Sequence, residues 1–371
     1  MRRRILSIIT AVALCLGLCL TGAWAADDSG NQETRTTRTE QLKLTNQDAE
    51  NETEGWSWTK TDENGNYTLT LDNVNFEVSN DSAITFSMDK NTWLDTITIV
   101  LIGENRVIST NQSENAYNSS GIYLDTSSYR SPRKIEVSGS GSLTVEGYRC
   151  GISLGTDNLH FNGVTVNTRA NYPDGLLVTN SGTLLIENSK VSANTISATG
   201  LTSTDSDISV VLDSLPDTWT YSVSLITAHS VDISGGSLTL AGSEENPAYN
   251  AISNDNQTSI DLSGCQMDIR NVQYGLSVNA GTINLTDVSG VIFCTESGTL
   301  LTSGNAAFHA NNVNSSDCSI YAQTGSNIFI YGDCSLPSEI TELTVSGDLI
   351  IETGKTFTIG EGQKITFSNY N

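Results

Sequence analysis

Short runs of alternating apolar and polar residues follow one another along most of the chain, and they return at a nearly constant distance. An aliphatic residue that follows a small one recurs every 24 to 30 residues. This series is Ile122, Ile152, Leu176, Leu201, Leu225, Ile252, Leu276 and Leu300. A second series of alternating runs begins at Ile135, Leu159, Leu184, Ile208, Val231, Ile260 and Ile283. Two features that share one period indicate an internal repeat, which outranks local signals in deciding the fold.

The residues inside each repeat distinguish between two repeat classes of similar period. Leucine-rich repeats need helix formers on their convex side, whereas these units consist of Val, Ile, Thr and Ser broken by Gly, Asn and Asp. Three strands of about five residues with tight turns account for one unit, and the crossover rule makes the winding right-handed. We therefore predict an all-β fold, a right-handed single-stranded parallel β-helix with coils of about 24 residues.

The two ends of the chain depart from this pattern. Alternation on either side of Asn64-Gly65 predicts an N-terminal hairpin, and this outweighs a calcium loop at Asp62, because Leu71 stands where that loop needs glutamate. Short strands with Gly-containing turns near the C-terminus predict a β cap. The predicted organisation is a signal peptide at 1–25, a flexible polar leader at 26–54, the hairpin and first coils at 55–110, the parallel β-helix at 111–317, and C-terminal coils with the cap at 318–371.

The first 25 residues indicate export. Arg2 to Arg4, the apolar run Ile5 to Leu20 and the motif Ala23-Trp24-Ala25 are typical of a secretory signal peptide. No later apolar run is long enough to span a bilayer, and no covalent anchor is expected. We expect a secreted, extracellular protein, released or held at the cell surface by a partner.

Net charge limits the partners. The formal charge of −24 becomes −27 when the three signal arginines leave, which argues against nucleic acid and anionic lipid. The acidic excess is compatible with Ca2+, but no motif supports a site, so no cofactor is predicted. Five cysteines remain after export, without a CxxC pair, and we expect them to be small buried hydrophobic residues rather than disulfides or metal ligands.

Tyrosines recur at steps of about one or two repeats, which predicts a partial aromatic stripe along one edge. The candidate ligand-binding residues are Tyr148, Tyr172, Asp174, Tyr221, Tyr249 and Tyr274. In one interpretation the rings protect the corner of the coil by stacking on one another. In the other they pack on the apolar faces of sugars while Asp174 and nearby asparagines bind hydroxyl groups. The sequence leaves both interpretations open.

Catalysis is the alternative to binding. Many parallel β-helices cleave acidic polysaccharides, and hydrolytic members need two carboxylates on either side of the scissile bond. Four aspartates fall near the repeat period: Asp157, Asp205, Asp207 and Asp232. However, the chain has no pectin-hydrolase motif, its arginines are scattered, and His160, His229 and His309 share no motif. No catalytic residue and no metal ligand is predicted.

Several phrases resemble one group of proteins. The signal peptide, "YTLTLDNVNFEV", "IEVSGSGSLTVEGYRCGISL" and "LTVSGDLIIETGKTFTIGEGQKITF" are similar to secreted β-solenoid surface proteins of Gram-positive gut bacteria, many of them carbohydrate-binding or uncharacterised. The resemblance implies a non-catalytic adhesion or glycan-binding module, with a polysaccharide or a host or bacterial surface glycan as partner. The alternatives are a polysaccharide lyase or glycoside hydrolase with an acidic groove, and a structural stalk.

Overall fold

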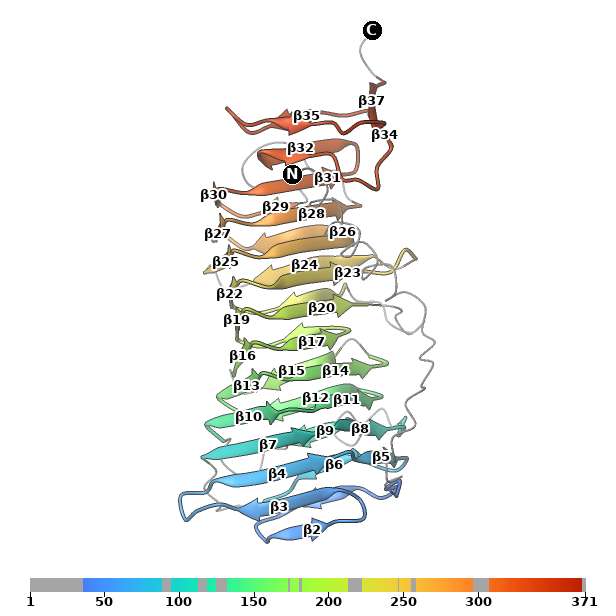
Figure 1. Ribbon diagram of the computed structural model, residues 1–371, viewed down its shortest axis with the longest axis vertical. Helices are drawn as coiled ribbons and strands as arrows, with labels where there is room; N and C mark the ends of the chain where they lie inside the picture. Colours follow the sequence, from blue (N-terminus) through green and yellow to red (C-terminus); the bar gives the residue numbers. More distant parts are fainter. Residues whose placement is uncertain are drawn as a thin grey trace, which may run out of the picture. The chain divides into compact units, whose positions relative to one another are not determined.

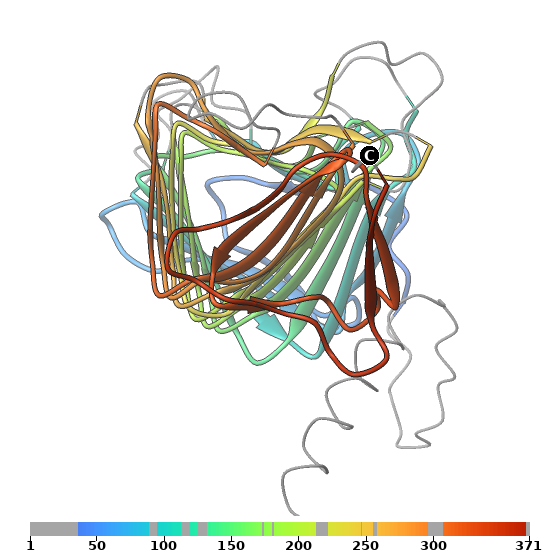
Figure 2. The ribbon, with the colours of Figure 1, turned by 90° about the horizontal axis from the view of Figure 1, so that it is seen from above.

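The computed structural model describes residues 36–88, 95–112, 119–124, 132–172, 174–179, 182–212, 222–245, 247–254, 258–295 and 307–368. These ranges lie in one compact unit, residues 35–371, and they form strands and turns without a helix. Successive strands stack in parallel along one axis (Figure 1), and a view along that axis shows the coils superposed (Figure 2). The predicted all-β parallel solenoid is confirmed.

Nine of the ten coils contribute strand residues to each of three faces, and the last contributes to two of them. The first face is a parallel stack of β4 (Tyr67–Asp72), β7 (Thr96–Ile102), β10 (Lys134–Gly139), β13 (Asn158–Asn162), β16 (Thr183–Glu187), β19 (Gly200–Thr204), β22 (Ser230–Ser234), β25 (Ser259–Ser263), β27 (Thr282–Thr286) and β30 (Asn312–Ser316). We number the coils 1 to 10 from the one that begins with β4 to the one that begins with β30.

The other two faces belong to a second, larger sheet. The second face holds β5 (Asn75–Val78), β8 (Glu104–Ser109), β11 (Ser142–Gly147), β14 (Thr165–Ala170), β17 (Lys190–Ala193), β20 (Asp207–Val211), β23 (Ser237–Ala241), the start of β26 (Gln266–Val278), β28 (Ser289–Cys294) and β31 (Ser319–Thr324). The third face holds β6 (Ile84–Phe86), β9 (Ile122–Leu124), β12 (Cys150–Gly155), β15 (Asp174–Thr179), β18 (Ile196–Ser197), β21 (Ser224–Thr227), β24 (Ala248–Asn254), the end of β26 and β29 (Phe308–His309). In β26 the register shifts between Ile269 and Val272, so this single strand turns the corner from one face to the next.

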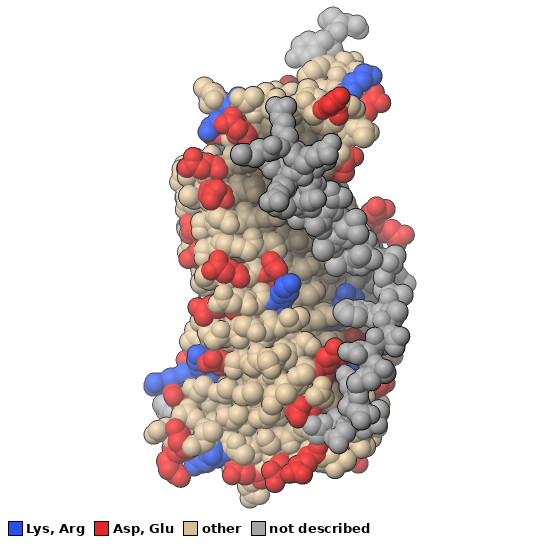
Figure 3. Space-filling model, viewed as in Figure 1, with Lys and Arg blue, Asp and Glu red and all other residues tan. Residues whose placement is uncertain are grey.

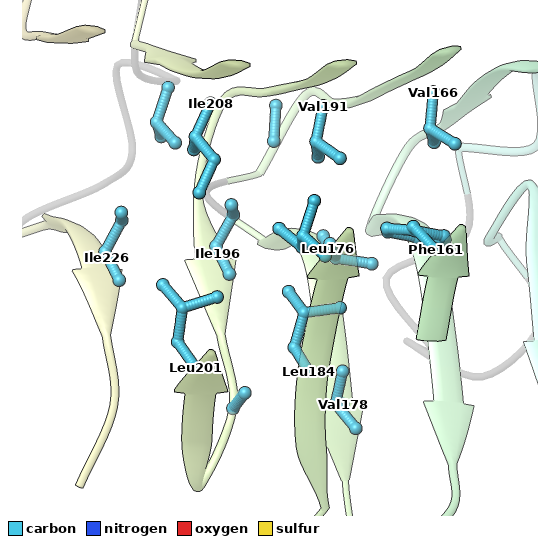
Figure 4. Close-up of a cluster of buried hydrophobic side chains, with 14 of the residues drawn as sticks. Phe161, Val166, Leu176, Val178, Leu184, Val191, Ile196, Leu201, Ile208 and Ile226 are labelled. Atoms are coloured by element: carbon cyan, nitrogen blue, oxygen red, sulfur yellow. The ribbon is translucent and has the colours of Figure 1, made fainter. Parts of the chain in front are cut away.

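Buried side chains form continuous rows from coil to coil. Alternate residues of each strand point inward, so one apolar residue stacks on the next in register. Figure 4 shows three such rows: Leu184 beside Leu201, Val166 beside Val191 and Ile208, and Leu176 beside Ile196 and Ile226. A core shared between coils means that neighbouring coils stabilise one another.

These rows correct the predicted series in places. On the third face the row runs through Ile122, Ile152 and Leu176 as predicted, but it continues through Ile196 and Ile226 instead of Leu201 and Leu225. Phe308 takes the place proposed for Leu300, which lies outside the described residues. On the first face Leu201 replaces Ile208, which belongs to the second face.

The cause of this error is that coil length varies. On the first face, in-register residues lie 17 positions apart between Leu184 and Leu201 but 38 apart between Ile97 and Ile135. The difference in length falls between the paired strands, whose register is kept from coil to coil. A prediction that assumes a constant period of 24 residues therefore assigns residues to the wrong face at the shortest coil.

The corner between the first and second faces is the most regular one. At this corner a residue with positive φ recurs from coil to coil, and it is always Asn, Asp or Gly; examples are Asn73, Gly103, Gly163, Asn188, Asp205, Gly235, Gly264, Asp287 and Asp317. Glycine has no Cβ to clash in this conformation, and Asn and Asp tolerate it better than other side chains. The Asn, Asp and Gly residues that separate the alternating runs in the sequence are thus the residues that adopt positive φ at this corner.

The N-terminal end is ordered earlier than the sequence suggested. β1 (Leu42–Leu44) pairs in parallel with β6, and β2 (Ala49–Asn51) pairs with β3 (Trp56–Lys60). Both strands lie within the segment 26–54 that was expected to be a flexible leader. The correction has a physical reason, since Leu42 and Leu44 are buried against the first coil. The predicted hairpin is confirmed, because β3 and β4 are antiparallel and Asn64-Gly65 lies in their connection.

The winding changes at the C-terminal end. β32 (Asn327–Gly332) runs antiparallel to β31 and so reverses the chain direction. The chain then forms β33 (Cys334–Ser335), β34 (Glu342–Val345), β35 (Leu349–Ile351), β36 (Phe357–Thr358) and β37 (Lys364–Phe367). β35, β36 and β37 stack on β32, β33 and β34 respectively and make the terminal coil.

The five cysteines of the described residues are buried, as predicted, and none of them is in a disulfide: Cys150, Cys265, Cys294, Cys318 and Cys334. Burial raises the pKa of Cys265 to about 11 and that of Cys294 to about 12. Because the thiolate is the reactive form, we expect these thiols to resist modification in the folded protein. A thiol titration of residues 26–371 at pH 8 checks this: little reaction is expected before denaturation and five equivalents after it, and rapid native labelling would contradict the burial.

Candidate binding site at the tyrosine corner

Four of the five predicted tyrosines lie at one corner of the solenoid, between the second and third faces. Tyr148 connects β11 with β12, and Tyr172 lies between β14 and β15. Tyr249 is the second residue of β24, and Tyr274 follows the register shift inside β26. We call this edge the tyrosine corner. The predicted common edge is therefore present for these four residues.

The four rings form two pairs on neighbouring coils. The ring centroids of Tyr148 and Tyr172, on coils 3 and 4, lie 5.3 Å apart with an interplanar angle of 74°. Tyr249 and Tyr274, on coils 7 and 8, repeat the same 5.3 Å and 74°. Both pairs have the edge-to-face geometry that aromatic rings prefer. Among the described residues the rings at this corner thus form two local pairs.

The two pairs differ in exposure. Tyr249 has 40% of its surface exposed, and only a few other large apolar side chains among the described residues are as exposed. Its partner Tyr274 is half-buried and packs against the core, while Tyr148 and Tyr172 are half-buried. Tyr249 therefore presents ring surface to solvent while Tyr274 supports it from below.

The remaining two predicted residues cannot be placed in the same way. Tyr221 lies outside the described residues. Asp174 is the first residue of β15, where its backbone is in register with Cys150, but its side chain is not among those described. Asn250, adjacent to Tyr249, is buried and donates a hydrogen bond to Ser224 Oγ, so its amide serves the fold.

Sequence reasoning did not connect Arg149 with the aromatic residues. Its guanidinium carbon lies 4.9 Å from the centroid of the Tyr172 ring, which is a cation–π contact. Arg149 immediately follows Tyr148 in the chain. Two consecutive residues at the tyrosine corner of coil 3 therefore provide an aromatic ring and a cation. The adjacency "YR" was the available signal, but the contact depends on the neighbouring coil and could not be deduced without the register.

Coil 5 interrupts the series of rings. Asn194 stands at this corner, donates to the carbonyl oxygens of Ala170 and Tyr172 and accepts from the Ala170 amide. It thereby fixes the backbone that carries Tyr172. Coils 5 and 6 lie between Tyr172 and Tyr249, and the three steps from coil 4 to coil 7 correspond to about 14 Å at the usual spacing of stacked strands.

The aspartates considered for catalysis do not gather at one place. Asp205 is a positive-φ turn residue, and Asp207 accepts from Ser237 and lies 3.8 Å from Lys190. Asp232 lies on the first face, in register with Asp261. Asp205 and Asp207 lie at or beside the corner between the first and second faces of coil 6, whereas Asp232 lies in β22 on the first face of coil 7.

The shifted pKa values among the described carboxyl groups also favour structural roles. The pKa of Asp62 and that of Glu136 are lowered, mainly by hydrogen bonds from Asn66 and Lys134. Partial burial raises the pKa of Glu339, but the hydrogen bond and charge of Arg270 outweigh it and the net shift is downward. A general acid needs the opposite shift, and none of these three carboxyl groups has it.

His160 takes part in contacts within the fold. It is almost fully buried on the first face, in register with Glu136, and its Nε2 lies 2.9 Å from a carboxylate oxygen of Glu187. The described residues contain no cluster of three or more metal-ligating side chains and no helix that could span a lipid bilayer. Figure 3 shows one face of the molecule, on which acidic side chains outnumber basic ones.

Comparison with known proteins adds nothing to this geometry, because no protein-family model, curated protein or solved structure matches the chain.

Proposed function

We propose that this protein is a non-catalytic extracellular module that binds glycans at a bacterial surface through the tyrosine corner. The observation that carries the proposal is the exposed ring of Tyr249, supported by Tyr274 on the next coil. An exposed tyrosine offers a flat apolar surface to a pyranose ring and a hydroxyl group to its polar rim. The scattered aspartates and the downward pKa shifts favour binding over hydrolysis.

A glycan array with residues 26–371, with and without Ca2+, tests the proposal. A parallel assay for reducing or unsaturated sugar ends separates binding from cleavage. Retention without cleavage is the expected result. Cleavage would show instead that the protein is a polysaccharide-degrading enzyme. The absence of both retention and cleavage would favour a structural stalk.

The stalk has one observation in its favour. Each tyrosine pair is packed edge to face, and Arg149 covers part of the Tyr172 ring. Contacts of this kind stabilise a corner without any ligand.

Substitution of Tyr249 distinguishes these two roles. We expect Tyr249→Ala to weaken retention on the responding glycan by about tenfold or more, as loss of a central aromatic contact does. The melting temperature should change by only a few degrees, because the ring is substantially exposed. Tyr249→Phe is the matched control, since it keeps the stacking surface. Undiminished retention with a large loss of stability would show that the ring only packs.

A further inference from the structure

The chain contains two Asn-Gly sequences, Asn64-Gly65 and Asn162-Gly163. The first lies in the connection between β3 and β4, and in the second Asn162 is the last residue of β13 in coil 4. Both asparagines are exposed, and both glycines have positive φ, 84° for Gly65 and 67° for Gly163. The two sites differ instead in how the glycine nitrogen is held.

An asparagine that precedes glycine can react with its own main chain. The glycine nitrogen bonds to the side-chain carbon Cγ, the bond from Cγ to the amide nitrogen breaks, and that nitrogen leaves as ammonia with the proton of the glycine N–H. Water then opens the cyclic imide at either carbonyl carbon and gives aspartate or isoaspartate. Glycine favours the reaction because it has no Cβ to hinder the approach. No oxidant, reductant or cofactor is consumed, but the glycine nitrogen must be able to reach Cγ.

The nitrogen of Gly65 lies in the turn, outside the ladder of the hairpin, which ends at the pair Lys60 and Tyr67. Gly65 is buried, and its carbonyl oxygen accepts a 3.1 Å hydrogen bond from the Asp95 amide. Ring closure, however, uses the nitrogen of Gly65. Ammonia leaves from Asn64, and water enters there, where the side chain is exposed.

The side chain of Asn64 is only weakly held. The Asp62 carboxylate accepts a 2.8 Å hydrogen bond from the backbone amide of Asn64, but the side-chain nitrogen of Asn64 lies 3.4 Å from it. The longer distance is beyond the usual range for N–H donors. The amide group that has to leave is therefore held less firmly than the backbone beside it.

The nitrogen of Gly163 is held between two coils. Asn162 is in register with Glu187 of β16, and the Gly163 N–H donates a 3.0 Å hydrogen bond to the Glu187 carbonyl oxygen. Ring closure at this site requires that bond to break and the two strands to separate locally. The rate then falls with the small population of the opened state, so the same dipeptide is protected here.

We propose that Asn64 is a site of spontaneous deamidation and isomerisation in the folded protein, whereas the stacking of the coils protects Asn162. Aspartate at this position adds a carboxylate beside Asp62 and Glu63, where an amide stood. Isoaspartate lengthens the main chain inside the turn, and turn length fixes the register of the hairpin strands. The modification therefore loosens β3, which carries the buried Trp58.

Peptide mapping by mass spectrometry, on residues 26–371 incubated in the folded state at pH 8, tests this proposal. The mass gain from amide to acid should accumulate at Asn64 at least about tenfold faster than at Asn162. Incubation in concentrated urea is the control, because unfolding frees the Gly163 nitrogen and the two rates should converge. An unmodified Asn64 or equal rates in the folded protein would overturn the proposal, and so would a difference that persists in urea.

Asn64→Gln is the matched variant for the structural consequence. Glutamine keeps the amide, but its longer side chain would have to close a larger ring, which forms much more slowly. Hydrogen exchange of residues 56–72 should accelerate during incubation of the wild-type chain and stay constant in Asn64→Gln. Equal acceleration in both chains would show that modification of Asn64 does not loosen the hairpin.

Discussion

Replacing Gly290 by alanine is expected to destabilise coils 8 to 10 by about 3 kcal/mol or more. Gly290 lies in β28 with φ of 145°, and it occupies an inward position in register with Met267 and Ile320. A Cβ at this residue would overlap the backbone carbonyl oxygen of Met267. Backbone cannot move aside as a side-chain tip can, so the stacked strands would have to separate.

The control for this substitution is Gly163→Asn. Gly163 also has positive φ, at 67°, but no atom lies within 4 Å of a Cβ built there. Asn73 and Asn188 already occupy the equivalent corner of other coils, so asparagine should be nearly neutral. Urea unfolding and hydrogen exchange measure the stability of both variants, and only the Gly290→Ala variant is expected to lose stability. Equal stability of the two variants would mean that strain at Gly290 is not what constrains it.

Trp58→Ala is expected to cost about 3–5 kcal/mol, as for other large buried aromatic residues. Trp58 is fully buried, stacks on Tyr67 at a centroid distance of 4.9 Å and contacts Phe86 edge-on at 5.8 Å. Its Nε1 donates a 2.6 Å hydrogen bond to the carbonyl oxygen of Thr45. The alanine variant would therefore lose the packing of the first coil and the bond to the segment that precedes β2.

The damage should remain local, because each coil contacts mainly its neighbours. Hydrogen exchange should accelerate in residues 42–86 of the Trp58→Ala variant, while the distant coils keep their protection. Trp58→Phe serves as the comparison, since it retains a ring and loses the hydrogen bond, which is worth about 1 kcal/mol. Uniform acceleration along the whole chain would contradict the idea of a separable N-terminal end.

The repeat and its strands could be predicted because each coil obeys the same local rule. Alternation identified Ile135, Leu159 and Leu184 as one buried row, and register confirms it. The assignment failed at Leu201 and Ile208, because both are buried aliphatic residues seven positions apart and only coil length decides which face each one joins. Loop length carries no periodic signal, so the sequence could not reveal the short coil.

The candidate site was predictable in position but not in detail. Period alone placed Tyr148, Tyr172, Tyr249 and Tyr274 at one edge. The division into two pairs could not be deduced, since it depends on Asn194 taking the corner in coil 5. The contact of Arg149 with Tyr172 joins different coils and likewise requires the register.

The shortest coil has a consequence for protein design. Thr183 to Thr199 completes one turn in 17 residues, with three strands joined by the two-residue corners Asn188-Ser189, Asn194-Thr195 and Ala198-Thr199. Because longer coils stack on both sides of it without loss of register, this segment is a minimal module. Tandem copies of it would give a scaffold of chosen length, on which loops of different size could be displayed at one corner at regular intervals of about 5 Å.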